Sequence, residues 1–233
     1  MRHLDLFSGI GGFALAASWV WGKDHKILSF CEIEKFPQKV LKKHWPDVPC
    51  HDDIKTMKGD KYGRVDILTG GFPCQPYSEA GKQRGKSDNR ALWPEMFRII
   101  KEAKPRWIIG ENVDGFIYMG LDTALSDLES EGYETTAFIL PACSVNAQHK
   151  RSRIWIVANA KGAGKSKMFC KSRLSAQLGG SNWFCWRYWS NEPGVGRVVD
   201  GIPNRVDRLK GLGNAIVPQV VVPIMEAIKR IDS

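Results

Sequence analysis

Short runs of continuously apolar residues alternate along this chain with longer amphipathic segments, and this alternation restricts the fold more than any other feature. The four clearest pairs of run and segment are 4–7 with 13–21, 27–31 with 35–44, 65–68 with 92–103, and 107–109 with 121–131. A run without polar alternation indicates a strand covered on both faces, and an amphipathic segment indicates a helix that covers it. The sequence therefore predicts an α/β fold with a mostly parallel, doubly wound sheet.

Two further predicted strands, 135–140 and 153–158, are joined by a connection too short for a crossover helix. We expect them to form an antiparallel pair at one edge of the sheet. Pro218 is suited to begin a helix near the C-terminus. The apolar positions by which this helix should pack back on the sheet are Val221, Val222, Ile224, Met225 and Ile228.

The length of 233 residues, 43% of them hydrophobic, suits one large core with a small appendage. Interval 159–192 differs from the rest, since it is basic and poor in aliphatic residues apart from an aromatic cluster at 183–189. We therefore divide the chain into a main domain (1–158), an inserted region (159–192) and a segment that returns to the main domain (193–233).

Lys and Arg (34) outnumber Asp and Glu (25), which gives a net charge of +9. Such a charge favours a polyanionic partner such as nucleic acid, with general surface solubility as the alternative. Six cysteines without a Cys-x-x-Cys pair indicate a reducing cytoplasm and no metal site. We expect no membrane partner, because no apolar stretch comes near the length of a membrane span.

Four sequence blocks carry candidate chemistry. The glycine-rich stretch 5–13 lies where the first strand should turn into the first helix, and 71–76 presents Cys74 directly after a predicted buried strand. Glu111 ends another apolar run, and a Gly-Asn-Ala-Ile-Val-Pro-Gln block follows at 213–219. Because α/β folds place ligands at the carboxyl ends of their strands, these blocks should meet in one site.

In this order the four blocks resemble the DNA (cytosine-5)-methyltransferase family, of the short bacterial or phage type. The resemblance covers about 2–158 and 193–233 and implies a Rossmann-like, S-adenosylmethionine-dependent methyltransferase fold. It also implies methyl transfer from S-adenosylmethionine to carbon 5 of cytosine in DNA, with S-adenosylhomocysteine as product. The expected mechanism is a covalent cysteine adduct on a flipped-out base, and the expected setting is restriction–modification in the cytoplasm, in association with the nucleoid.

The glycine turn has a spacing that departs from the dinucleotide fingerprint, and an ordinary tight turn is the alternative to a cofactor site. Glu32, after the second predicted strand, can accept both ribose hydroxyl protons of a nucleoside, although a solvated surface Glu is the default for such a residue. By resemblance, Ile33 and Ile54 contact the adenine, Ile33 standing where relatives often have Trp, and Asp53 binds its amine. The full expected cofactor set is Phe7, Gly9, Ile10, Gly11, Gly12, Glu32, Ile33, Asp53, Ile54, Gly71, Pro73, Asn214 and Ala215.

The resemblance assigns catalysis to Cys74 as nucleophile and to Glu111 as the carboxyl group that binds N3 and the exocyclic amine of cytosine. A buried inert thiol and a strand-end surface acid are the alternatives. Block 149–153 resembles the family's Gln-x-Arg-x-Arg, with His149 in place of Gln. In that block Arg153 would donate to the cytosine O2, and Arg151 would hold the Glu111 carboxylate and the cysteine loop. A plain basic surface strand is the alternative.

Double-stranded DNA is the expected partner, bound by a monomer. The basic, glycine-containing stretch 78–90 would be a mobile loop that contacts phosphates while the base is flipped. Interval 159–192 would be a reduced target-recognition region, in which 161–173 and 183–189 could read bases. A hydrophobic plug over the sheet edge is the alternative for the aromatic cluster.

Two other functions stay open on the sequence alone. RNA cytosine methylation uses the same chemistry on another acceptor, and some members of the family perform it. A non-enzymatic binding module, or a subunit whose recognition half lies on another polypeptide, would explain the short interval. Cys74, Glu111 and Arg153 argue against the binding module, since a protein that only binds needs no thiol there.

Overall fold

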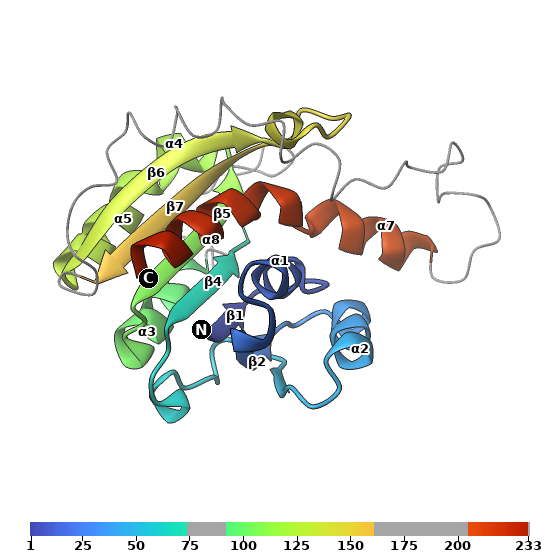
Figure 1. Ribbon diagram of the computed structural model, residues 1–233, viewed down its shortest axis with the longest axis horizontal. Helices are drawn as coiled ribbons and strands as arrows, with labels where there is room; N and C mark the ends of the chain where they lie inside the picture. The colour runs from blue at the N-terminus through green and yellow to red at the C-terminus, as the bar shows by residue number, and fades with distance from the viewer. Residues whose placement is uncertain (74–91, 161–204, 233) are drawn as a thin grey trace.

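The computed structural model describes residues 1–73, 92–160 and 205–232. Its centre is a seven-stranded sheet in the order β3-β2-β1-β4-β5-β7-β6, with helices on both faces (Figure 1). The strands are β1 (Arg2–Leu6), β2 (Lys26–Cys31), β3 (Cys50–His51), β4 (Ile67–Gly71), β5 (Trp107–Val113), β6 (Tyr133–Pro141) and β7 (Ser152–Ala160).

The first five strands along the chain pair in parallel, whereas β7 pairs antiparallel with both β5 and β6. The predicted parallel sheet with an antiparallel edge pair is therefore confirmed. Connections from β1 go outward through β2 to β3, and those from β4 go outward to β5. The direction of the connections changes between β1 and β4, and α/β folds bind ligands at the carboxyl ends of the strands at such a switch point.

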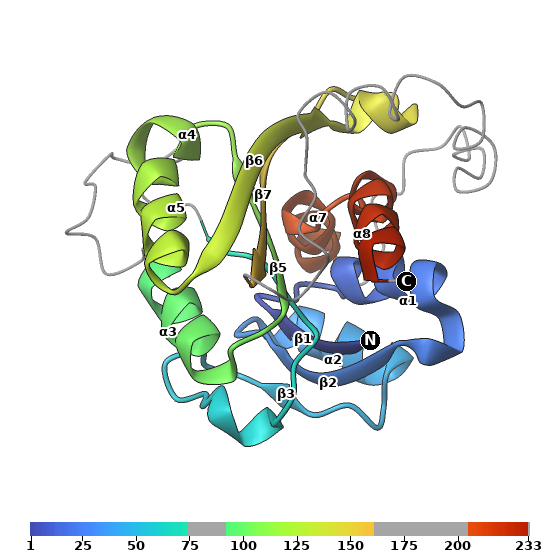
Figure 2. The ribbon, with the colours of Figure 1, turned by 60° about the vertical axis from the view of Figure 1, so that its left-hand side comes forward.

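The helices are α1 (Gly12–Trp21), α2 (Lys35–His44), α3 (Trp93–Ala103), α4 (Phe116–Met119), α5 (Leu121–Ser130), α7 (Arg205–Asn214) and α8 (Pro218–Asp232). Short 3-10 turns lie at η1 (Gly22–Asp24), η2 (Asp60–Tyr62) and η4 (Ala142–Val145). Helices α3, α4 and α5 cover one face of the sheet, and α1 and α8 cover the other (Figure 2).

Helix α8 packs directly on α1 because small and branched residues meet at their contact. Ala16 and Ala17 of α1 are fully buried, as are Val221, Val222 and Met225 of α8. Small side chains on one helix let the other approach closely, so the two helices pack together against the β-sheet. The packing predicted for the C-terminal helix is confirmed.

Segment Lys210–Asp232 has the length and apolar composition of a membrane span, and among the described residues it is alone in this. The expectation that no stretch comes near that length was therefore wrong. Six of its apolar side chains, from Val220 to Ile228, are buried in the core beside α1 and the sheet. Packing in this core accounts for the composition of the segment.

Several elements differ from their predicted bounds. Strand β5 continues to Val113, so Glu111 lies within the strand rather than at its end, and β7 continues to Ala160, past the proposed boundary at 158. Strand β3 and helix α7 were not predicted. Most of the proposed inserted region, including the aromatic cluster at 183–189, lies outside the described residues, as do Cys74 and the loop at 78–90.

Candidate active site

The turn between β1 and α1 follows an unusual backbone path. Phe7, Gly9 and Gly11 have φ angles of 52°, 52° and 89°, in the left-handed region that favours glycine. A Cβ atom on Gly11 would come within 2.5 Å of the Trp45 ring, and one on Gly12 within 2.6 Å of the Ile216 side chain. Close contact, as well as backbone conformation, thus explains the glycines at 11 and 12.

Glu32, at the end of β2, ties this turn to the next strand. Its carboxylate accepts hydrogen bonds from the backbone N–H of Gly9 (2.8 Å) and of Glu34 (2.8 Å). Burial raises the pKa of Glu32, while these two hydrogen bonds oppose the rise. An acidic side chain is therefore held beside the glycine turn, and its role as a ribose acceptor stays a prediction.

The three residues expected at the adenine lie in different environments. Ile33 is 68% exposed, whereas Ile54 is 5% exposed and belongs to the core. Asp53 accepts a hydrogen bond from the backbone N–H of Lys55 (2.9 Å). Of the two apolar residues, Ile33 is thus the one that presents an open surface.

Segment 210–217, which comprises the end of α7 and its connection to α8, lies against the glycine turn. Lys210 forms an ion pair with Glu34 (Nζ to Oε1, 2.6 Å). A Cβ on Gly211 would be 3.6 Å from Ile10, and Ile216 lies against both Gly12 and Gly71. The block at 213–219 and the glycine turn therefore meet, as their expected shared role requires.

Glu111 lies at the centre of the second half of the site. It is 9% exposed, and its Oε1 is 3.0 Å from Nε of Arg153. Burial raises the pKa of the Glu111 carboxyl to about 6, although the charges of Arg153 and Arg151 lower it. The carboxyl group can therefore give or take a proton near neutral pH.

Strand β4 brings the two halves together. Gly71 is the register partner of Glu111, and a Cβ there would lie 3.3 Å from the Glu111 Oε2. The absence of a side chain at 71 leaves room for the carboxylate. Pro73 is exposed and is the last described residue before Cys74, which the sequence places three residues after Gly71.

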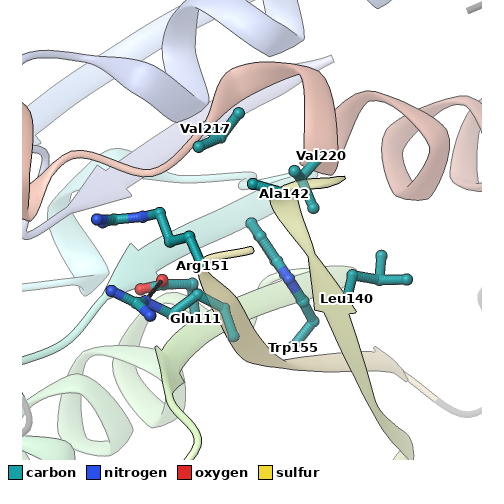
Figure 3. A pocket seen from close by; sticks show the side chains of 8 residues that line it. Glu111, Leu140, Ala142, Arg151, Trp155, Val217 and Val220 are labelled. Atoms are coloured by element: carbon teal, nitrogen blue, oxygen red, sulfur yellow. Dashed lines mark ion pairs between the residues drawn. The ribbon is translucent and has the colours of Figure 1, made fainter. Parts of the chain in front are cut away.

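A small hollow lies beside Glu111. Figure 3 shows its charged groups on one side and its apolar groups on the other, with the Trp155 ring between them. The lining residues are Glu111, Leu140, Ala142, Arg151, Arg153, Trp155, Val217 and Val220. Sequence reasoning missed Leu140, Ala142, Trp155 and Val220. Trp155 is the register partner of Glu111 on β7, so the strand register would have identified it.

A buried polar chain beneath the glycine turn was also missed. The Thr69 hydroxyl donates to Oδ1 of Asp5 (2.6 Å), and Nε2 of His3 lies 2.7 Å from the Thr69 oxygen. Asp5 is fully buried, and its Oδ2 has no hydrogen-bond partner within the described part of the chain. Burial raises the pKa of Asp5 to about 8. Within the same residues, no cluster of His, Cys, Asp or Glu could hold a metal ion.

The family model for C-5 cytosine-specific DNA methylases matches residues 1–179. The chain belongs to this family. Type II methyltransferase M.HgiCII of Herpetosiphon aurantiacus is 34% identical over 164 residues, which are 67% of this chain and 36% of that protein. M1.ScrFI of Lactococcus lactis subsp. cremoris is 37% identical over 163 residues (67% and 41%). M.HhaI of Haemophilus parahaemolyticus is 32% identical over 167 residues (67% and 48%). The chain thus spans less than half the length of these relatives.

Solved structures confirm the fold. A mutant of Spodoptera frugiperda DNMT2 superposes with a TM-score of 0.59 at 24% identity, over 71% of this chain and 52% of that one. S. pombe Dnmt2 methyltransferase gives 0.63 at 21% identity, over 78% and 56%. The Rossmann-like methyltransferase fold expected from the sequence is therefore established.

The two arginines of the 149–153 block contact different groups. Arg153 forms the ion pair with Glu111, while the charge of Arg151 also lowers the pKa of the Glu111 carboxyl. Arg151 donates hydrogen bonds to the backbone carbonyls of Gly213 (2.9 Å) and Ala215 (2.8 Å). The expected roles of the two arginines at Glu111 and at the cytosine stay predictions.

Proposed function

We propose that this chain transfers a methyl group from S-adenosylmethionine to carbon 5 of cytosine in DNA. The observation that carries the proposal is the buried Glu111, paired with Arg153 and placed in register with Gly71. A carboxyl group with a pKa of about 6, beside the strand that leads to Cys74, suits an enzyme that activates a pyrimidine. Family membership supports the same reaction.

Carbon 5 of cytosine is too weak a nucleophile to accept a methyl group without activation. In the proposed mechanism the Cys74 thiolate adds to carbon 6, which moves electron density toward carbon 5 and N3. Glu111, in its protonated form, donates a hydrogen bond at N3 and accepts one from the exocyclic amine, which stabilises that charge. Loss of the carbon 5 proton and departure of Cys74 then restore the aromatic ring.

Arg153 would have two successive roles, first as the ion-pair partner of Glu111 and then as a hydrogen-bond donor to the cytosine. In the structure it pairs with Glu111, which keeps a buried carboxylate from standing alone. With a base in the site, its guanidinium can also donate to the cytosine O2, since its planar fork offers five N–H donors. The target base has to leave the duplex for this contact, because Glu111 is nearly buried.

The residues around the glycine turn fit S-adenosylmethionine. The turn leaves open space at Gly9, where a Cβ would meet nothing within 4 Å, and Glu32 is held beside it as an acceptor. Ile33 offers an exposed apolar surface for the adenine. When bound there, the cofactor supplies an electrophilic methyl group on a sulfonium sulfur, and S-adenosylhomocysteine remains.

The biological setting is part of the proposal. Double-stranded DNA in the cytoplasm, in association with the nucleoid, is the substrate, and the relatives' Type II names favour a restriction–modification role. The chain would act as a monomer on DNA. Because it spans less than half of these relatives, the proposal includes a partner polypeptide for target recognition as the alternative to recognition through interval 159–192 alone.

Three experiments test the function. Purified chain with S-adenosylmethionine should form a covalent adduct with duplex DNA that contains 5-fluorocytosine, since fluorine at carbon 5 blocks the last step. Transfer RNA serves as the competing acceptor in a parallel methylation assay, and methylation of RNA alone would replace DNA as the substrate. Conversion-resistant sequencing of DNA from cells that express the chain then reports the methylated sequence context.

A further inference from the structure

Arg151 joins two parts of the chain that are far apart in sequence. Its Nη1 donates to the carbonyl of Gly213 (2.9 Å), and its Nη2 donates to the carbonyl of Ala215 (2.8 Å). Both terminal nitrogens are therefore engaged by carbonyls two residues apart, at the end of α7. A planar guanidinium suits this double contact, which the single ammonium of lysine does not reproduce.

The backbone fixes the position from which Arg151 reaches out. Its φ angle of 30° is rare for a residue with a side chain. The backbone N–H of Ala142 donates to the carbonyl of Lys150 (2.7 Å), so η4 holds the residue just before Arg151. An uncommon conformation that the surrounding structure maintains is typical of a functional position.

The segment that Arg151 holds is also fixed on its other side. Ile216 fills the space above Gly12, where a Cβ would come within 2.6 Å of its Cγ1, and it lies 3.9 Å from the Cβ position of Gly71. The C-terminal segment is thereby seated on both the glycine turn and the end of β4. Of the proposed cofactor contacts, Asn214 lies between the two acceptors of Arg151, and Ala215 is itself an acceptor and directly precedes Ile216.

We infer that Arg151 is a positioning residue for the cofactor, which holds the segment 213–216 across the glycine turn. This inference rests on the proposed function. It gives different roles to two arginines that lie two residues apart. Arg153 pairs with the catalytic carboxylate of Glu111, and Arg151 supports the binding of a nucleoside sulfonium and its thioether product. Loss of the Arg151 contacts should therefore weaken cofactor binding rather than the chemical step.

The test compares Arg151→Lys with Arg153→Lys in the full chain. Calorimetric titration with S-adenosylhomocysteine should show that Arg151→Lys weakens binding about tenfold, as loss of one charge-assisted hydrogen bond implies. Arg153→Lys should bind within about twofold of the parent chain. In methylation assays, Arg151→Lys should raise the KM for the cofactor and recover kcat at saturation, whereas Arg153→Lys should lower kcat.

A second variant keeps the inference testable if Arg151→Lys fails to fold. Ile216→Ala removes the contact with Gly12 and should weaken S-adenosylhomocysteine binding by itself. If both side chains hold one segment, the loss in the double variant should be smaller than the product of the two single losses. Circular dichroism and thermal melts of each variant establish that the fold is intact.

The outcomes separate the inference from the function on which it rests. If Arg151→Lys, or Ile216→Ala in its place, binds S-adenosylhomocysteine as tightly as the parent chain, the inference is overturned. A lower kcat at saturating cofactor with unchanged affinity would overturn it as well. That result would instead support a role for Arg151 in holding the Glu111 carboxylate. A parent chain that binds no S-adenosylhomocysteine would instead overturn the proposed function, and the inference with it.

Discussion

Asp5→Asn should stabilise the protein at pH 8 and destabilise it near pH 4. Asp5 is fully buried, and burial raises its pKa from 3.8 to about 8, although the Thr69 hydrogen bond opposes the rise. An acid with a higher pKa in the folded state binds its proton more tightly there. It therefore opposes folding increasingly as the pH rises from its unfolded to its folded pKa.

The size of the effect follows from the same shift. About 4 pH units correspond to at most about 6 kcal/mol of folding free energy at pH 8, and to none below pH 4. The amide of Asn places N–H donors where Oδ2 of Asp5 has no partner, at a pH-independent cost of about 1–3 kcal/mol. We expect a net gain of about 3 kcal/mol at pH 8 and a net loss of about 1–3 kcal/mol near pH 4.

Urea unfolding of both proteins between pH 4 and 8.5 measures this difference, and taking the difference removes the contributions that they share, such as that of His3. Asp66→Asn is the matched control. The hydrogen bonds from Arg2 and Arg64 lower the pKa of Asp66 against the opposing effect of burial, so this variant should lose stability at neutral pH. A constant difference between Asp5→Asn and the parent across the pH range would refute the reasoning.

Three further predictions concern the site. The kcat/KM of the parent chain should show an ionisation near pH 6 from Glu111, and Glu111→Gln should lose that ionisation together with about 100-fold of its rate; a profile with the ionisation intact in the variant would exclude Glu111 as its source. Gly12→Ala should weaken S-adenosylhomocysteine binding, because its Cβ would strike Ile216, and should destabilise the fold by about 1–3 kcal/mol. In Gly9→Ala the added Cβ meets open space at a φ of 52°, so the free energy of unfolding should fall only by the backbone strain of about 1–2 kcal/mol. Equal losses of binding affinity in both glycine variants would contradict the steric argument. Cys74→Ala should form no adduct with 5-fluorocytosine DNA on denaturing gels, whereas Cys143→Ala, which removes an exposed free thiol, should form it normally; an adduct with Cys74→Ala would refute the mechanism.

The sheet could be predicted from the sequence because most of its strands coincide with short, continuously apolar runs. The apolar runs at 27–31 and 107–109 lie in β2 and β5, which are covered on both faces. The short connection before 153 correctly gave an antiparallel edge pair. Strand β3 was not predicted because its two residues, Cys50 and His51, are too few to form a pattern.

The site could be predicted only in part, because several of its features depend on pairing between distant segments. Glu32 and Glu111 follow apolar runs, so it could be inferred that both lie toward the carboxyl ends of their strands, on the side of the glycine turn. The partner of each arginine could not, since Arg151 meets carbonyls more than sixty residues away. Burial of Asp5 depends on Thr69 from a neighbouring strand, and the position of Trp155 depends on strand register.

The interval between Ala160 and Arg205 begins and ends on one scaffold. At the first end, β7 is paired with β5. At the second end, α7 is held by the hydrogen bond from Arg151 to the Gly213 carbonyl and by the ion pair of Lys210 with Glu34. These attachments involve only residues outside the interval. On the proposed function, this arrangement would let a different DNA specificity be inserted in the interval while the proposed site for methyl transfer keeps its shape.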